Sequence, residues 1–259
     1  APLSHTHAFT SADELKYFEE EALIPTTGAI DWESFAIGED TYLAVANYYN
    51  GSTYNVDSKI YRWNGRNFAE YQFIPTHGAT DWEVFTIEGA AYLAVANSGD
   101  DSKVFRWDGS GFVETQSIPT QSAYDWESFT INGDSYLVVA NLRAKWGEWN
   151  IDSVVYKWDE SRFVEFESIS TSGACDWAFF TAGEDAYLAV ANGRWSVSSF
   201  TPDSRVYRWN GASFEEMLSI PTDSAHDWEA FAIGSSEVVV WNAAPMEQPR
   251  PQAVAQKQA

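Results

Sequence analysis

The stretch Ile24–Phe35, which runs IPTTGAIDWESF, decides the fold because the chain repeats it. Its Asp-Trp pair recurs every 44 to 51 residues, and each copy is followed by a second phrase that first appears as Tyr42–Asn47, YLAVAN. The aspartates of the successive copies are Asp31, Asp81, Asp125, Asp176 and Asp227. A period of about 40 to 50 residues with several strand signals in each copy predicts the blades of a β-propeller.

Each copy contains two further phrases, so four strands are expected per blade. The third phrase is first seen at Tyr61–Trp63, and a clear copy of the fourth is Phe112–Thr120. Side chains alternate over runs of four to eight residues, which are too short for helices. Asn-Gly and Asp-Gly pairs, as at Asn64 and Asp108, favour tight hairpins between the third and fourth strands. The sequence therefore predicts an all-β propeller of four-stranded blades.

The offset between the two ends of the repeat predicts how the ring closes. The chain begins with an isolated fourth strand at Phe18–Thr26, and its last copy ends just after a second strand at Glu237–Asn242. We therefore expect five blades, closed by N- and C-terminal strands that pair in one blade, with Ser4–Thr10 as the missing third strand. Residues 1–242 form one predicted propeller domain, and residues 243–259, rich in Ala, Pro and Gln, are predicted to be a disordered tail or linker.

Charge and composition restrict the partners. The formal net charge of −23 would repel the phosphates of nucleic acids, which excludes them as expected partners. No apolar run approaches the ~20 residues of a membrane-spanning helix, so membrane insertion is not expected. Cys175 is the single cysteine, so a disulfide within the chain is excluded. Nothing in these features specifies the oligomeric state.

The repeated aspartates form the first candidate site. In a four-stranded blade the start of the innermost strand lies at the same end as the loop between the second and third strands. Five carboxylates would thus surround the channel mouth, where Ca²⁺ prefers six to eight oxygen ligands. The asparagines that end the second strands lie beside them, at Asn47, Asn97, Asn141, Asn192 and Asn242. The alternative is that each Asp accepts hydrogen bonds from its own Gly-Ala turn.

A glutamate follows most of these Asp-Trp pairs, as at Glu33, Glu83, Glu127 and Glu229, and Ala178 replaces it in one copy. A buried Glu must be paired or protonated, so we expect it to hydrogen-bond to the neighbouring blade rather than to act in catalysis.

Loops between the second and third strands form the second candidate site, because they differ among copies while their flanks stay constant. Their aromatic residues lie outside the repeated core positions and belong to types that dominate interface hot spots. The predicted partner-binding residues are Tyr48, Tyr49, Tyr54, Trp146, Trp149, Trp195 and Phe200. The alternative is that these loops fold back and bury their own rings, as compact surface loops do.

Three phrases, IPTxGAxDWExF, YLAVAN and VYRWxGxxF, together resemble the epilepsy-associated repeat, also called the EPTP or EAR repeat, of secreted propeller proteins. The resemblance implies a propeller that binds other proteins outside the cell without catalysis of its own, in some members with a calcium ion in the central channel. This chain departs from the pattern in having five copies where seven are usual, and at Ser170, Ala178 and Trp241.

Three functions follow as hypotheses. The first is a non-enzymatic secreted or cell-surface module that presents the aromatic loops to a protein ligand or receptor. The second is a multivalent lectin that binds glycans in equivalent pockets. The third is a hydrolase or lyase that uses the channel carboxylates. Catalytic motifs are missing from the sequence, and His5, His7, His77 and His226 have no repeated partner, so no catalytic residue is expected.

Overall fold

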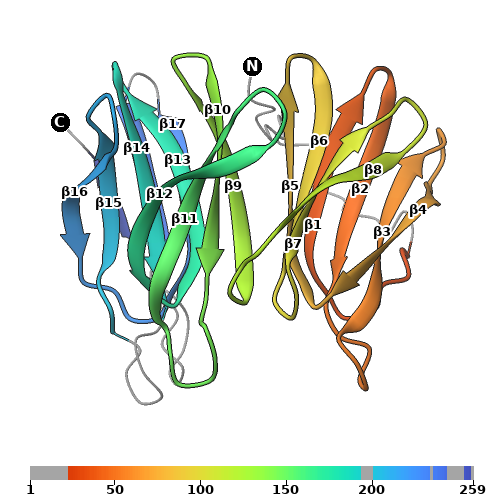
Figure 1. Cartoon of the computed structure of the whole chain (residues 1–259), viewed down its shortest axis with the longest axis horizontal. Coiled ribbons are helices and arrows are strands. Elements are labelled where there is room, and N and C mark those ends of the chain that lie inside the picture. Colours follow the sequence, from red (N-terminus) through yellow and green to blue (C-terminus); the bar gives the residue numbers. More distant parts are fainter. Residues whose placement is uncertain (1–22, 194–200, 234–235, 244–253, 258–259) are drawn as a thin grey trace, which may run out of the picture.

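Strands β1 to β19 make up the fold, in a computed structural model that describes residues 23–193, 201–233, 236–243 and 254–257. Figure 1 shows the sheets standing side by side, with their strands along the height of the molecule and their turns at its two ends. Helices long and apolar enough to cross a membrane are absent from these described ranges. The all-β, propeller-type architecture predicted from the repeat is confirmed.

Four of the sheets have four antiparallel strands in chain order. The first contains β1 (Ala29–Ile37), β2 (Asp40–Asn47), β3 (Asn55–Trp63) and β4 (Phe68–His77). The second contains β5 (Ala79–Ile87), β6 (Ala90–Asn97), β7 (Ser102–Trp107) and β8 (Phe112–Ile118). The third contains β9 (Ala123–Ile131), β10 (Asp134–Asn141), β11 (Asn150–Trp158) and β12 (Phe163–Ser172). The fourth contains β13 (Ala174–Ala182), β14 (Asp185–Asn192), β15 (Ser204–Trp209) and β16 (Phe214–Ile220).

The fifth sheet has three described strands, β17 (Ala225–Ile233), β18 (Ser236–Ala243) and β19 (Val254–Lys257). Strand β19 pairs along β18 in the third position of the sheet, within the segment 243–259 that is predicted to be a tail or linker. An unpaired strand edge offers backbone N–H and C=O groups to any extended segment that reaches it. The predicted strand Ser4–Thr10 and residues 18–22 of the predicted strand Phe18–Thr26 lie outside the described residues, and with them closure by the N-terminus. The last four residues of the second prediction, 23–26, are described and are not in a strand.

Two recurrent bulges interrupt the ladders. The first skips the residue before the repeated Asp, so that Ala29 pairs with Asn47 and Asp31 with Ala46. The second lies between the two outer strands of a sheet, where Ile60 faces Gln72 and the next pair is Tyr61 with Glu70. A bulge rotates the strand locally and re-aims the side chains beside it. The same two irregularities recur in sheets two, three and four.

The hydrophobic core lies between neighbouring sheets. Trp82 of the second sheet packs with Phe35 and Tyr42 of the first, and equivalent clusters join each later pair of sheets. Only 2% of the surface of Trp82 is exposed, whereas Trp32 of the first sheet is 41% exposed. From the second sheet to the fifth, the repeated tryptophan is therefore buried against the sheet that precedes it. The innermost strands β1, β5, β9, β13 and β17 contact one another in that order.

Candidate functional site

The repeated aspartates link each blade to the next. In the first four sheets one carboxylate oxygen, Oδ2, accepts the backbone N–H of the tryptophan in the following sheet. The bonds run to Asp31 from Trp82 at 3.2 Å, to Asp81 from Trp126 at 3.0 Å, to Asp125 from Trp177 at 3.0 Å and to Asp176 from Trp228 at 2.7 Å. The alternative role expected for these residues, bonding to their own turn, is corrected by these partners. The bulge before each Asp accounts for the difference, since it re-aims the side chain.

The glutamates repeat the arrangement one step deeper along the same strands. Glu83 accepts the backbone N–H of Ser128 at 2.9 Å, and Glu127 accepts that of Phe179 at 2.8 Å. The expectation that these glutamates bond to the neighbouring blade is confirmed at both positions. We call these Asp and Glu contacts the axial latches.

Burial, in most cases with repulsion between neighbouring carboxylates, raises the pKa of seven acids on the innermost strands. We call them the axial acids: Asp31, Glu33, Asp81, Glu83, Asp125, Glu127 and Asp176. Burial, with repulsion from the Glu83 and Asp31 carboxylates, raises the pKa of Glu33 to about 9. Burial raises the pKa of Glu83 to about 7, although hydrogen bonds from Ser128 favour its charged form. The pKa of Asp125 lies well above its ordinary value for the same main reason, desolvation. These acids therefore hold their protons more tightly than exposed carboxylates do.

Metal binding is the other role predicted for the Asp ring, with Asp227 as its fifth member. Groups of three or more His, Cys, Asp or Glu side chains suited to a metal ion are absent from the described part of the chain. One oxygen of each latch Asp is also already engaged by a backbone N–H, which leaves fewer oxygens for an ion that needs six to eight. The described residues therefore fit the latch role, and calcium at this ring stays a prediction.

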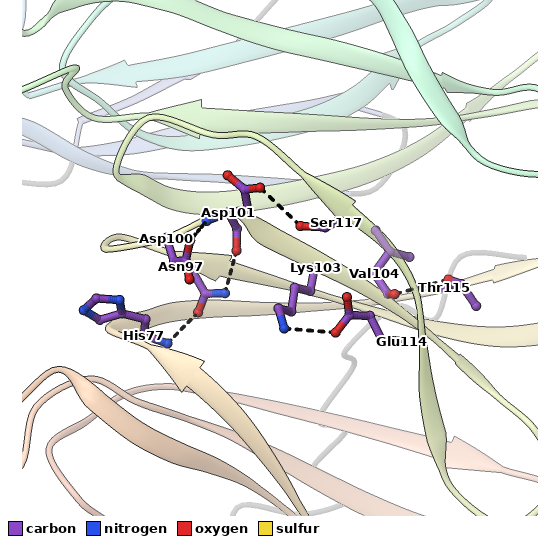
Figure 2. A network of polar contacts seen from close by, with 9 residues as sticks. All are labelled: His77, Asn97, Asp100, Asp101, Lys103, Val104, Glu114, Thr115 and Ser117. Carbon is purple, nitrogen blue, oxygen red and sulfur yellow. Dashed lines mark hydrogen bonds and ion pairs between the residues drawn. The ribbon is translucent and has the colours of Figure 1, made fainter.

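The repeated asparagines are structural clips. Figure 2 shows Asn97 accepting the backbone N–H of His77 at 3.1 Å and donating to the carbonyl oxygen of Asp101 at 2.9 Å. Asn47, Asn141 and Asn192 make the same two contacts in their sheets. These three and Asn97 are buried. Each ties a residue just before the innermost strand of its own sheet to the start of the third strand.

The loops between second and third strands gather at one end of the molecule, which we call the loop end; the lower edge of Figure 1 shows the β10–β11 loop there. In the first sheet the rings of Tyr48 and Tyr49 both pack on Tyr54, with centroids 5.1 and 4.7 Å apart. Tyr49 and Tyr54 are exposed. The predicted tyrosines therefore form one cluster whose outer members face solvent.

The two predicted tryptophans of the β10–β11 loop differ in their exposure. Trp146 is 67% exposed and its ring lies against the Arg143 guanidinium, 5.5 Å from its centroid. Trp149 is 1% exposed, contacts Trp146 edge to face, and accepts the backbone N–H of Gly173 through its carbonyl oxygen. Trp149 is thus a support for the loop and not a surface contact, as the fold-back alternative anticipated. Trp195 and Phe200 lie outside the described residues.

Burial also shifts the pKa of a cysteine and a histidine on the innermost strands. Burial, together with the nearby carboxylates, raises the pKa of the Cys175 thiol to about 12, so it stays neutral. Burial also lowers the pKa of His226. Residues His5 and His7 lie outside the described part.

A cavity between the second and third sheets was missed by sequence analysis. It is lined by Ala90, Arg106, Thr115 and Glu160, among others. Ala90, Thr115 and Glu160 differ in residue type from the equivalent positions of other copies. Arg106 keeps its type but lies beside one of these differences. An alignment of the copies would have indicated it, because Ala90 replaces the aspartate that pairs with the equivalent cation in three other copies.

Comparison with known proteins agrees with the repeat. The EPTP domain model matches residues 23–64, 67–108, 111–159 and 162–210. The chain is 36% identical over 230 residues to the thrombospondin-type laminin G domain and EAR repeat-containing protein of Mus musculus, and 39% identical over 232 residues to the Homo sapiens protein of that name. Each match covers 88% of this chain and 29% of the relative, so the chain spans less than a third of either relative.

Solved structures share the fold at low identity. An exo-β-1,3-galactanase from Phanerochaete chrysosporium superposes with a TM-score of 0.54 at 9% identity, over 85% of this chain and 57% of the enzyme. An α-L-arabinofuranosidase from Lactobacillus brevis has a TM-score of 0.50 at 12% identity, over 90% and 91% of the two chains. These likenesses extend to the fold alone. The four matched segments and the two relatives show that the chain belongs to the EPTP, or EAR, repeat family.

Proposed function

We propose that this chain is a non-enzymatic binding module, secreted or displayed at the cell surface, that presents the aromatic loop end to a protein partner. The observation behind the proposal is Trp146, two-thirds exposed and stacked against Arg143. Tryptophan and arginine are enriched among the residues that dominate interface energies. The extracellular setting is supported by the resemblance of this chain to the EAR repeats of secreted propeller proteins.

The exposed aromatics belong to one end of the molecule. Tyr48 lies near enough to Ser98 and Arg143 for both to lower the pKa of its phenol, while burial has the larger, opposite effect. The loops of the first, second and third sheets therefore meet around Tyr48. Because Trp149 is buried beneath Trp146, the exposed ring stands on a fixed base, which limits the ordering cost of binding.

The non-enzymatic part of the proposal rests on the axial acids. Six of them accept backbone N–H groups of the next sheet, namely Asp31, Asp81, Asp125, Asp176, Glu83 and Glu127. Groups engaged in holding the blades together are poorly placed to act as acid and base on a substrate.

The test is a binding screen of the labelled protein against an array of extracellular proteins, repeated with three variants. Trp146→Ala and Tyr54→Ala should each weaken a genuine hit at least tenfold. The matched control is Trp63→Ala, an exposed tryptophan at the opposite end of the first sheet, which should leave binding unchanged. Equal losses in all three variants, or none in any, would contradict the loop-end proposal.

A glycan array run beside the protein array separates the lectin alternative. Sugar hits that survive Trp146→Ala and Tyr54→Ala would move the activity away from the loop end. Absence of sugar hits together with variant-sensitive protein hits is the expected result.

A further inference from the structure

One repeated ion pair is broken in the second sheet. At the hairpin end, opposite the loop end, a cation on the third strand meets an aspartate at the start of the second strand. The pairs are Arg62 with Asp40 at 2.6 Å, Lys157 with Asp134 at 2.7 Å and Arg208 with Asp185 at 2.7 Å. Arg106 holds the cation position in β7, but Ala90 stands where the aspartate should be.

Arg106 keeps the placement of its counterparts. It lies across from Tyr92, as Arg62 lies across from Tyr42. It is exposed, and among the described residues it forms no ion pair. The place beside Arg106 that holds an aspartate in three other sheets therefore holds no carboxylate.

A ring is missing at the same place. In the outer strand, the bulge residue of the first sheet is Tyr71, whose ring stacks on Trp107 with centroids 6.0 Å apart and meets Tyr42 edge to face at 5.3 Å. Phe166 is the bulge residue of the third sheet, and its ring lies 5.9 Å from Trp209 and 5.4 Å from Tyr136.

The second sheet has Thr115 at this bulge, although the underlying pair is conserved in form, with Tyr92 and Trp158 at 5.6 Å. Figure 2 shows the Thr115 hydroxyl turned to the carbonyl oxygen of Val104, at 3.2 Å. The short side chain leaves Tyr92 and Trp158 without the ring that covers their counterparts.

Both omissions open into one cavity. Its volume is about 320 Å³, and Ala90, Tyr92, Arg106, Thr115 and Trp158 all line it. That volume is at the small end of the ~300–1,000 Å³ typical of ligand pockets. The cavity thus combines an unpaired cation with an uncovered aromatic pair.

Two glutamates at the rim add a third departure. Glu160 has φ of 78° where the equivalent hairpins have Gly65, Gly109 and Gly211. Glu88 has φ of 51° where two of the other sheets have Gly38 and Gly183. Side chains are rarely placed in this left-handed region, and such strain gathers at functional sites. Both carboxylates line the cavity and can only accept hydrogen bonds when ionised.

We propose that this cavity binds an acidic sugar unit, a six-membered ring that bears a carboxylate. The carboxylate takes the place of the missing aspartate and pairs with Arg106. The sugar ring takes the place of Tyr71 or Phe166 and stacks on Trp158 beside Tyr92. Its hydroxyl groups donate hydrogen bonds to Glu88 and Glu160. An aromatic carboxylate without hydroxyl groups would leave these two acceptors without donors.

The net charge of −23 opposes nonspecific binding of anions to this chain. An acid that binds in this cavity must therefore be held by local pairing with Arg106. The site lies at the hairpin end, so it is separate from the proposed protein-binding loops.

The experiment titrates glucuronate into the intact chain and follows the ¹⁵N–¹H signals of the tryptophan indoles by NMR. Glucose tests the need for the carboxylate, and benzoate tests the need for the hydroxyl groups. Glucuronate is expected to bind at least tenfold more tightly than either. Equal binding of glucose would overturn the role of Arg106, and tighter binding of benzoate would overturn the sugar assignment.

Variants locate the site. Arg106→Gln removes the cation, and Ala90→Asp restores the aspartate found in three other sheets, so each should weaken glucuronate binding at least tenfold. Thr115→Phe should do the same by filling the ring position. The matched control is Arg62→Gln, whose cation is already paired with Asp40 and whose loss should not matter. Unchanged binding in Arg106→Gln and Ala90→Asp, with folding verified by circular dichroism, would overturn the proposal, as would an equal loss in Arg62→Gln.

Discussion

The Oδ2 atom of Asp125 lies 3.0 Å from the backbone nitrogen of Trp177, a residue 52 positions later and in the next sheet. The same contact recurs from the first sheet to the fifth, so the most conspicuous acid of the repeat serves the joint between blades. Because a buried backbone N–H left without an acceptor is costly, each joint is specified by a polar contact as well as by packing.

Removing this latch should cost stability through the N–H that it leaves behind. We expect Asp125→Ala to be less stable than Asp125→Asn by about 1–3 kcal/mol, because both lack the charge but only asparagine retains an acceptor for Trp177. Urea unfolding monitored by tryptophan fluorescence measures the difference. Equal stabilities would show that the hydrogen bond contributes nothing to the joint.

Ionisation of the axial acids should make the protein less stable as the pH rises. The pKa of Glu83 is about 7 in the folded chain against an ordinary value of 4.5, so the folded state binds the proton more tightly than the unfolded state. Its stabilising contribution is full below about pH 4.5 and is lost between there and about pH 7. Glu83→Gln should flatten the melting temperature over that window, since glutamine does not ionise.

Calcium provides a second arm of the same measurement. A cation held by the Asp ring would neutralise the acids and lower their pKa values, so wild-type protein with calcium would also lose the pH dependence.

A pH profile of Glu83→Gln as steep as that of the wild type would contradict the assignment to this residue.

The two tryptophans of the β10–β11 loop should behave oppositely. Trp149→Ala is expected to cost about 3–5 kcal/mol, because it leaves a cavity under the loop. Trp146→Ala should change stability by less than about 0.5 kcal/mol, since its ring is mostly in solvent. Thermal unfolding of the pair measures both. Similar losses in the two variants would mean that the loop is built differently.

Strain at Glu160 should be released by glycine. Glu160→Gly is expected to raise stability by about 1 kcal/mol, because φ of 78° disfavours any side chain. The reciprocal control is Gly109→Ala in the equivalent hairpin, where φ is 100° and an added Cβ meets no atom within 4 Å. That variant should lose a similar amount. A loss of stability in Glu160→Gly would show that the side chain contributes more than its backbone costs.

Local rules made most of the fold predictable. Alternation along β5 and β6, the Asn-Gly and Asp-Gly turns, and the period of the Asp-Trp pairs depend on residues close in sequence, and each gave the observed strand or turn. Bulges were not predictable, because a bulge is defined by its partner strand. The bulge at Tyr124 re-aims the Asp125 carboxylate toward the next sheet, whereas the sequence predicted a metal site or a bond to its own turn.

The candidate sites show the same division. Trp146 and Trp149 are chemically alike and three positions apart, so only packing decides that one is exposed and the other buried. Likewise, Arg106 resembles Arg62 in the sequence, and its unpaired state depends on Ala90, which is adjacent only through the pairing of β6 with β7.

The sequence by itself determined the strands, their four-fold grouping and the family, because alternation, turn chemistry and repetition are encoded within one copy of about 50 residues. The tertiary structure alone decided what each repeated polar residue bonds to and which copy lacks an ion-pair partner. The latches of Asp31, Asp81, Asp125 and Asp176 and the cavity at Arg106 join residues of different copies, or a residue to a missing partner. Such contacts are a property of how the sheets pack against one another, which no single copy contains.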